Sequence, residues 1–417
     1  MWSDQIAVVG YSCRFPGAFN PQQLWQLLLA GGDAVSIRPR HKWLVPPASW
    51  ATGSPIEFAM SHPGGFLDYP AVDGNPPIDP QQSLFLQCAG EALESAELRA
   101  DGWQDWVVGV FAGATNLDYH RWLYRQPSAV SFSTYLASAP SAIPNRVSSH
   151  FNFSGPSVAV DTACSSGLVA VHLACQSLLS GETKLCLAGG VSLILTPDSM
   201  LTFLASGLLS PTGRCRVFSA DADGYVRAEG CGIVALTTLR HAKSAKLPVR
   251  ALVRASAVNH TGRSSNLAMP RASALAEVML QAYSVAGVSP HDVGYLEAHA
   301  VGTQVGDILE LKAIERVFGA ARRTGIERLP IGSLKTNFGH SEPASGLAGL
   351  LKAIFVASEG KIPPNLHFKQ LNPRARIAEE FIQVPSEQQN LSTDKKFVGV
   401  SAFGATGTNT HLVISSP

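Results

Sequence analysis

The sequence predicts an α/β fold built in layers, because short runs rich in Val, Ile and Leu alternate with helical patterns along its whole length. Its 417 residues exceed one ordinary hydrophobic core, so we expect either two packed halves or one unusually large unit. The alternation starts again after Val249, and no low-complexity linker interrupts it. We therefore divide the chain into one half spanning residues 1–248 and another spanning residues 249–417.

The first half carries five strand-like runs. These are Ile6–Gly10, Val107–Ala112, Ser157–Val160, Leu185–Leu195 and Gly232–Leu239. The pairs Asp79-Pro80 and Thr196-Pro197 each place a capping side chain before a proline, which favours the first position of a helix. We therefore expect helices to begin at Pro80 and Pro197, and a third helix, rich in small residues, to span Ser166–Gly181.

The second half repeats this alternation. Its strand-like runs are Val249–Val258, Val293–Ala298, Ile331–Leu334, Val398–Ala402 and His411–Ile414. Its helical patterns are Ala272–Ala286, Gly306–Phe318 and Gly346–Ser358. Strands and helices that alternate in this way are typical of a layered α/β fold.

An internal repeat relates the two halves. Ser166-Gly-Leu through Gly181 matches Ser345-Gly-Leu through Gly360 at a constant offset of 179 residues. Each segment follows a strand, ends in a glycine suited to a C-cap, and is too rich in Ala, Gly and apolar residues to face water. We expect the two helices to pack against each other and to bring the preceding turns, with Cys164 and His340, to a common centre.

Cys164 lies in the string Val160-Asp-Thr-Ala-Cys-Ser-Ser-Gly167, where a strand turns through small polar residues into a helix. A thiol at a helix N-terminus faces unpaired backbone NH groups and the positive end of the helix dipole, which lower its pKa. We therefore predict a nucleophile with a lowered pKa. The alternative is a small, inert core cysteine, since cysteine is among the most buried residue types.

Two histidines, His299 and His340, each end a strand-like run and enter a turn rich in Gly, Thr and Asn. Loops at strand ends are where α/β proteins bind ligands. Either histidine alone suits a hydrogen-bonded structural role, but with Cys164 the pair suits an acyl thioester reaction whose oxyanion or enolate is stabilised by neutral NH donors. We expect no metal site, because there is no HExxH and no carboxylate at ligand spacing.

A glycine-rich turn, Phe403-Gly-Ala-Thr-Gly-Thr408, follows the strand-like run that begins at Val398. No Gly-Lys-Ser/Thr and no helical pattern follow it, so we reject a nucleotide-binding loop. Backbone NH groups of this turn suit an oxyanion hole. The alternative is a tight hairpin between two central strands.

The composition argues against several classes of function. The 32 basic and 31 acidic residues leave a net charge of +1, which speaks against nucleic-acid binding driven by bulk charge. Seven cysteines, odd in number and without a CxxC pair, indicate a reducing compartment. The longest apolar run, Cys186–Leu195, has about half the length that spans a bilayer. We therefore expect a cytoplasmic protein that binds neither nucleic acid nor membrane.

With these residues in view, the chain resembles the ketosynthase domain of modular type I polyketide synthases, which belong to the thiolase-like condensing enzymes. Its motifs occur in the family's order: Ile6-Ala-Val-Val-Gly-Tyr-Ser-Cys-Arg-Phe-Pro-Gly, Asp79-Pro-Gln-Gln, the Cys164 string, Ala222-Asp-Gly-Tyr-Val-Arg-Ala-Glu-Gly, the two histidine strings and Gly407-Thr-Asn. The resemblance implies two pseudo-symmetric βαβαβ halves in an α-β-α-β-α sandwich. It also implies a homodimer whose interface lies beside the cysteine.

The resemblance implies a role for each matching residue. Cys164 looks like the residue that takes the acyl chain from the phosphopantetheine of an acyl or peptidyl carrier protein, while the domain itself binds no cofactor. His299 and His340 look like the pair that binds a malonyl-type thioester, assists its decarboxylation and stabilises the enolate, which then attacks the acyl group. Lys335 resembles the lysine that supports this pair.

The same resemblance implies an oxyanion hole formed by the backbone NH groups of Cys164 and Ala405. The substrate-binding positions that it implies are Val301, Thr303, Asn337, Phe403 and Ala405. Fatty-acid condensing enzymes carry a bulky Phe where Ala405 stands, which favours the polyketide enzymes and, with them, adjacent megasynthase domains as partners.

Two departures from the family pattern keep an alternative open. Val301 replaces the first threonine of the His-Gly/Ala-Thr-Gly-Thr motif, which removes a hydrogen bond to pantetheine, although Thr303 remains. The segment between Asp68 and Asp79 is shorter than in most relatives. The alternative is a non-extending ketosynthase that transfers or cyclises the bound chain without condensation.

Two other functions fit less well. A degradative thiolase uses a second cysteine near the C-terminus, whereas the last cysteine here is Cys231. A catalytically silent partner protein in a dimer usually lacks the nucleophile, whereas Cys164 is present.

Overall fold

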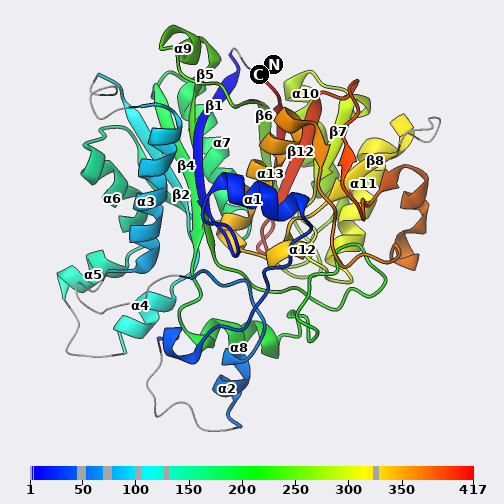
Figure 1. Ribbon diagram of the computed structural model, residues 1–417, viewed down its shortest axis with the longest axis horizontal. Helices are drawn as coiled ribbons and strands as arrows, with labels where there is room; N and C mark the ends of the chain where they lie inside the picture. The colour runs from blue at the N-terminus through cyan, green and yellow to red at the C-terminus, as the bar shows by residue number, and fades with distance from the viewer. Residues whose placement is uncertain are drawn as a thin grey trace.

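The computed structural model describes residues 2, 4–44, 53–68, 78–98, 103, 105–125, 131–322 and 328–417. Within these ranges, eleven strands form one sheet in the order β10-β8-β7-β12-β13-β6-β1-β5-β4-β2-β3, and helices cover both of its faces (Figure 1). The predicted α/β class is therefore confirmed.

The strands of this sheet are β1 (Ile6–Arg14), β2 (Val108–Gly113), β3 (Ser157–Val160), β4 (Leu185–Ser192), β5 (Gly230–Thr238), β6 (Ala251–His260), β7 (Val293–Glu297), β8 (Leu329–Gly332), β10 (Ile382–Gln383), β12 (Phe397–Phe403) and β13 (Thr408–Ser415). A separate pair is formed by β9 (Lys361–Ile362) and β11 (Gln389–Asn390). The α-helices are α1 (Pro21–Leu29), α2 (Pro55–Met60), α3 (Pro80–Ser95), α4 (Asp118–Leu123), α5 (Phe132–Ser138), α6 (Ala142–Phe151), α7 (Ser166–Leu179), α8 (Pro197–Ala205), α9 (Leu239–Ser244), α10 (Ala272–Ala286), α11 (Gly306–Arg322), α12 (Lys335–Phe338) and α13 (Ser345–Glu359).

Two sets of five strands repeat one pattern of pairing. In the order β3-β2-β4-β5-β1, the first two pairings are parallel and the last two antiparallel. The order β8-β7-β12-β13-β6 has the same pattern. A short antiparallel pairing of β1 with β6, centred on Ala7 and Leu252, joins the two sets into one sheet. The division of the chain at residue 248 stays a prediction.

Helices α7 and α13 lie between the two sets of strands, and each contacts strands of both. A methyl group on Gly167 of α7 would lie 2.5 Å from Leu347 Cδ2, and one on Gly346 of α13 would lie 2.6 Å from Leu168 Cγ. The contacts are reciprocal, because the Gly-Leu pair occupies the same place in each helix. The packing predicted from the internal repeat is confirmed, and it needs glycine at both positions.

The remaining helices cover the outer faces of the two sets. Helices α3 and α6 pack on β1, β2 and β5, while α10 packs on β6 and β13 with α11 beside it (Figure 1). Three buried hydrophobic clusters follow from this layering: one around α7 and α13, one beneath α3 and α6, and one beneath α10 and α11.

The helix starts predicted at Pro80 and Pro197 are confirmed. Asp79 caps α3 by accepting a hydrogen bond from the amide of Gln81 at 2.9 Å. Thr196 precedes α8 without a side-chain capping bond, and its own amide donates to Asp118 at 3.1 Å. The run predicted to extend to Leu195 leaves the sheet after Ser192, because its last three amides donate to side chains instead: Leu193 to Gln81, Ile194 to Glu229 and Leu195 to Asp118.

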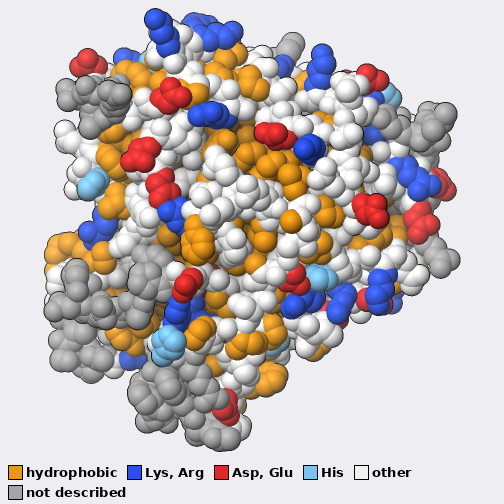
Figure 2. Space-filling model, viewed as in Figure 1, with side chains coloured by type: hydrophobic (Ala, Val, Ile, Leu, Met, Phe, Trp, Pro, Cys, Tyr) orange, Lys and Arg blue, Asp and Glu red, His pale blue; other side chains and the backbone are white. Residues whose placement is uncertain are grey.

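The face of the molecule in Figure 2 carries basic and acidic side chains intermingled, without a large field of one sign. This distribution agrees with the near balance of charges in the sequence. Among the residues with a described structure, no helix combines the length and the apolar character needed to cross a bilayer.

We predict that Gly167→Ala destabilises the protein by about 1–3 kcal/mol, because the added methyl group meets both Leu347 and the carbonyl oxygen of Pro343 at 2.5 Å. The matched control is Gly90→Ala in α3, where the nearest atom lies 3.5 Å away. This control should be neutral or slightly stabilising, since alanine favours a helix. Urea unfolding midpoints measure both, and equal midpoints would contradict the α7–α13 contact.

Candidate active site

One cavity of about 340 Å³ contains Cys164, His299 and His340 together. Cys164 follows β3 and His299 follows β7, whereas His340 follows the short helix α12. The predicted convergence of one thiol and two imidazoles is confirmed. Phe403 and Thr303 line the same cavity.

The turn before α7 holds Cys164 by a strained backbone. Ala163 has a φ of +56°, a left-handed conformation that is costly for a residue other than glycine. Its amide donates to Asp161 Oδ1 at 3.1 Å, and its carbonyl accepts from Ser166 Oγ at 2.6 Å. Asp161 and Ser166 therefore fix the turn that presents the thiol to the cavity, which is a use of stored strain typical of functional sites.

The prediction of a lowered pKa for Cys164 is wrong. Burial raises the pKa of this thiol to about 12, and the nearby carboxylate of Glu342 raises it further. The backbone NH groups of Ala405 and Cys164 and the charge of Lys335 act in the opposite direction but do not compensate. The cost of partly desolvating a thiolate beside the Glu342 carboxylate exceeds the stabilisation by a helix N-terminus, so the resting group is a neutral thiol.

The rings of His299 and His340 meet edge to face, with their centroids 5.5 Å apart. Burial and the charge of Lys335 hold the pKa of both imidazoles well below the usual value. Both rings are therefore neutral at physiological pH. Their Nδ1 atoms have no hydrogen-bond partner among the side chains and backbone that the structure describes.

Lys335 lies behind the two histidines, buried and outside the lining of the cavity. Its Nζ approaches Ser333 Oγ at 3.5 Å. Burial lowers its pKa, while the neighbouring carboxylates Glu297 and Glu310 raise it. Glu310 also accepts the amide of His299 at 2.8 Å, so the same carboxylate faces the lysine and fixes the histidine backbone.

The turn from Gly404 to Gly407 is a hairpin between β12 and β13, which confirms the structural alternative. The amide of Ala405 nevertheless reaches the sulfur of Cys164. The hairpin is therefore confirmed, and the oxyanion hole stays a prediction. The ring of Phe403 packs 5.4 Å from that of His299 at the base of the hairpin.

The remaining predicted substrate positions separate into two groups. Val301 and Thr303 line the cavity, as does Ala405. Asn337 does not, because its side chain is buried and donates to the carbonyl of Gly32 at 3.0 Å. A substrate-binding role for Asn337 is therefore corrected to a structural one.

Three functional residues carried no assigned role in the sequence. Glu342 lines the cavity and forms a bidentate ion pair with Arg227, at 2.5 and 2.9 Å. Tyr225 also lines the cavity, with its ring edge to face on His340 at 5.6 Å. The string from Ala222 contains both Tyr225 and Arg227, and an acidic residue two places after His340 was the available signal for Glu342.

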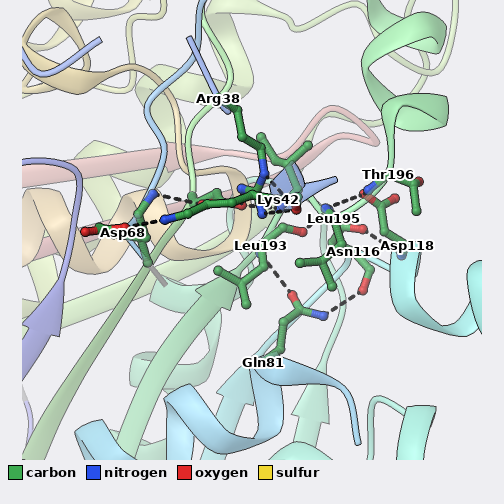
Figure 3. A network of polar contacts seen from close by, with 12 residues as sticks. Arg38, Lys42, Asp68, Gln81, Asn116, Asp118, Leu193, Leu195 and Thr196 are labelled. Carbon is green, nitrogen blue, oxygen red and sulfur yellow. Dashed lines mark hydrogen bonds and ion pairs between the residues drawn. The ribbon is translucent and has the colours of Figure 1, made fainter. Parts of the chain in front are cut away.

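A buried polar network supports Arg227 from the side away from the cavity. Arg227 donates to Ser199 Oγ at 2.8 Å, and Ser199 donates to Asp118 Oδ2. Figure 3 shows Asp118 also binding the amides of Leu195 and Thr196, beside the contacts of Gln81 and Asn116. These bonds fix the start of α8, from which Ser199 reaches Arg227.

Comparison with known proteins bears on this arrangement. The model for the N-terminal domain of β-ketoacyl synthases matches residues 3–242, and the model for the C-terminal domain matches residues 250–369. The chain belongs to the β-ketoacyl synthase family. Enzymes of this family transfer acyl groups and form carbon–carbon bonds, so the predicted enzyme class is confirmed.

Relatives of this ketosynthase are large synthases. It is 39% identical to the partially reducing polyketide synthase tpeA of Talaromyces stipitatus, over 100% of this chain and 17% of that protein. It is 42% identical to the polyketide synthase GfsA of Streptomyces halstedii, over 99% of this chain and 6% of that protein. The chain thus spans less than a fifth of the length of these curated relatives.

Solved structures show the same fold. The oxazolomycin ketosynthase domain OzmH KS7 of Streptomyces albus JA3453 aligns with a TM-score of 0.89 at 34% identity, over 99% of this chain and 75% of that chain. The ketosynthase from module 6 of the bacillaene synthase of Bacillus subtilis 168 aligns with a TM-score of 0.87 at 30% identity, over 99% and 72%. The predictions of a thiolase-like fold and of a ketosynthase of the polyketide synthase type are confirmed.

We predict that alkylation of Cys164 by iodoacetamide is slow at pH 7 and accelerates about tenfold per pH unit up to pH 10. A thiol whose pKa is about 12 gains thiolate in proportion to hydroxide over this range. Mass spectrometry of the intact protein gives the rate, and Cys164→Ala identifies the adduct. A rate that levels off between pH 7 and pH 9 would instead indicate a lowered pKa.

We predict that Arg227→Met lowers the free energy of unfolding by about 3 kcal/mol, because it leaves Glu342 buried without its partner. The double variant Arg227→Met/Glu342→Gln should recover most of this loss, since it removes the unpaired charge. Urea unfolding of the three proteins provides the comparison. No recovery in the double variant would contradict the pairing.

Proposed function

We propose that this domain catalyses decarboxylative Claisen condensation between an acyl chain on Cys164 and a malonyl-type extender held on a carrier protein. The observation that carries the proposal is the single cavity shared by the thiol and two neutral imidazoles. The ring NH of a neutral imidazole donates a hydrogen bond to a developing enolate oxygen and so stabilises the negative charge that decarboxylation produces.

In the first step, the sulfur of Cys164 attacks the carbonyl carbon of the incoming thioester. A new carbon–sulfur bond forms, the bond to the phosphopantetheine sulfur breaks, and the thiol proton passes to that departing sulfur. The backbone NH groups of Cys164 and Ala405, which already face the sulfur, would stabilise the oxyanion. A resting thiol with a raised pKa keeps its proton until this exchange takes place.

In the second step, the bond between Cα and the carboxylate of the malonyl group breaks and carbon dioxide leaves. The electron pair forms an enolate, whose oxygen is within the reach of His299 and His340 in this proposal. The enolate carbon attacks the acyl carbonyl on Cys164, a carbon–carbon bond forms, and the sulfur leaves as a thiolate that takes a proton from water. Lys335 supports the step as a positioning residue, because its charge adds to burial in lowering the pKa of both imidazoles.

The substrates would arrive on the phosphopantetheine of an acyl or peptidyl carrier protein, supplied with the adjacent domains of a megasynthase, and the domain itself would bind no cofactor. A hollow lined by Thr303 and Val305 adjoins the cavity and shares Thr303 with it. This hollow is a suitable path for the phosphopantetheine arm that carries the thioester. The free state of all seven cysteines supports a place in the cytoplasm.

We also propose a homodimer. Strand β3 is the last strand of the sheet, and its Val158 is 37% exposed. Helix α6 packs on β3, and α5, which packs on α6, exposes Phe132, Tyr135 and Leu136. An edge strand and an exposed apolar helix in the same half support pairing with a second copy on this edge, close to the Cys164 turn.

The non-extending alternative gains no support from the residues of the cavity. Val301 lines the wall without a polar group, and Thr303 is still there to contact a pantetheine arm. The shortened segment, residues 69–77, lies outside the residues that the structure describes.

We predict that His299→Ala and His340→Ala each retain acylation of Cys164 but slow the release of carbon dioxide from a malonyl carrier protein. Loss of one oxyanion or enolate donor typically costs about a hundredfold to a thousandfold in rate. The control is His172→Gln, since His172 bonds Ser256 outside the cavity. Intact-protein mass spectrometry and carbon dioxide measurement separate the two steps, and unchanged condensation in both variants would exclude the proposal.

A further inference from the structure

The cavity is lined by a phenol, Tyr225, whose hydroxyl has no partner among the residues that the structure describes. Tyr225 is 8% exposed, and its ring packs on His340 at 5.6 Å. Its hydroxyl group makes no hydrogen bond to any residue within the described ranges, although the side chain lines the cavity. A hydroxyl group that faces a cavity from a largely buried side chain, and that has no partner among the described residues, is available to a ligand.

A carboxylate lines the same space. Glu342 has a φ of +47°, so its backbone is strained in the left-handed region where the residue enters the cavity. Its two oxygens each accept one hydrogen bond from Arg227. A carboxylate has about four lone-pair sites, so it still has room to accept a hydrogen bond from the cavity side.

The carboxylate is held rigidly. Arg227 is 1% exposed, its guanidinium lies 4.8 Å over the ring of Phe203, and it donates to Ser199. The backbone of the arginine segment is also tied to His340, because the amide of His340 donates to Val226 and the amide of Ala228 donates to His340. These contacts fix the position of Glu342 relative to His340, and hence relative to Tyr225.

The phenol remains a donor throughout the physiological range. Burial and the negative charge of Glu342 raise the pKa of Tyr225 well above its usual value, and the ionisation of Cys164 acts on Tyr225 in the same direction. The cavity therefore presents one neutral donor and one acceptor among side chains that are mostly apolar, such as Phe203 and Met269.

A hydroxyl group is the ligand that can bind both residues, because it accepts a hydrogen bond from the phenol of Tyr225 and donates one to the carboxylate of Glu342. A keto oxygen uses only the donor, and a carboxylate is repelled by Glu342. We infer that Tyr225 and Glu342 form a subsite for a hydroxyl group on the acyl chain that Cys164 receives, so that 3-hydroxyacyl thioesters acylate the domain faster than their unsubstituted counterparts. This inference rests on the proposed function, which makes Cys164 the acyl acceptor.

The test compares two small thioesters of N-acetylcysteamine, butanoyl and 3-hydroxybutanoyl, with each hydroxyl enantiomer offered separately. Intact-protein mass spectrometry gives the rate at which each one acylates Cys164. Because both thioesters react with the same thiol, any change in its pKa cancels in the ratio of rates. The wild-type protein should favour one 3-hydroxybutanoyl enantiomer by between about twofold and tenfold, the effect of one hydrogen bond.

Tyr225→Phe keeps the ring against His340 and removes only the hydroxyl, so the ratio should fall to about one. Glu342→Gln should lower the ratio as well, since it removes the charged acceptor. The matched control is Tyr119→Phe, which removes a buried phenol that has no hydrogen-bond partner within the described ranges and does not line the cavity. The control should keep the wild-type ratio.

A wild-type ratio of one for both enantiomers overturns the inference, and this result needs no variant to fold. A preference that survives in Tyr225→Phe overturns it as well. Both outcomes leave the proposed function intact, because Cys164 is still acylated. If no thioester acylates Cys164, the proposed function is contradicted. The inferred hydroxyl subsite then loses its basis as well.

Discussion

The close contact between α7 and α13 is the constraint on which the site depends. Gly167 and Gly346 let the two helices approach until each glycine meets a leucine of the other helix. The turn before α7 carries Cys164, and the segment before α13 carries His340 and Glu342. A duplicated strand-turn-helix thus brings together groups that are remote in the chain, and a side chain at either glycine would move the two turns apart.

Burial determines the protonation states of the reactive groups in the cavity. The same exclusion of water raises the pKa of Cys164 and lowers that of both histidines, so the resting cavity holds three neutral reactive groups. The charged residues around them include the ion pair of Arg227 with Glu342, and Lys335, on which the carboxylates of Glu297 and Glu310 act. This arrangement lets charge develop only as a reaction proceeds, where preorganised NH groups can stabilise it.

The alternation of apolar runs was sufficient to predict the fold class and five strands in each half, and the internal repeat was sufficient to predict the packing of α7 against α13. The alternation could not predict where strands stop: β4 ends at Ser192, because the amides that follow bond to side chains remote in the chain, such as that of Leu195 to Asp118, 77 residues away. Spacing and motifs were enough to identify Cys164, His299 and His340. They were not enough for the pKa of the thiol, which depends on burial and on Glu342, or for Asn337, whose partner Gly32 lies at the far end of the chain.

The most direct test of the account is a crystal structure of the protein acylated on Cys164 with a butanoyl group. We expect the acyl oxygen to lie within hydrogen-bond distance of the backbone NH groups of Cys164 and Ala405. We also expect the rings of His299 and His340 to face the acyl carbon across the same cavity. An acyl oxygen turned away from both amides, or histidines that face separate pockets, would contradict it.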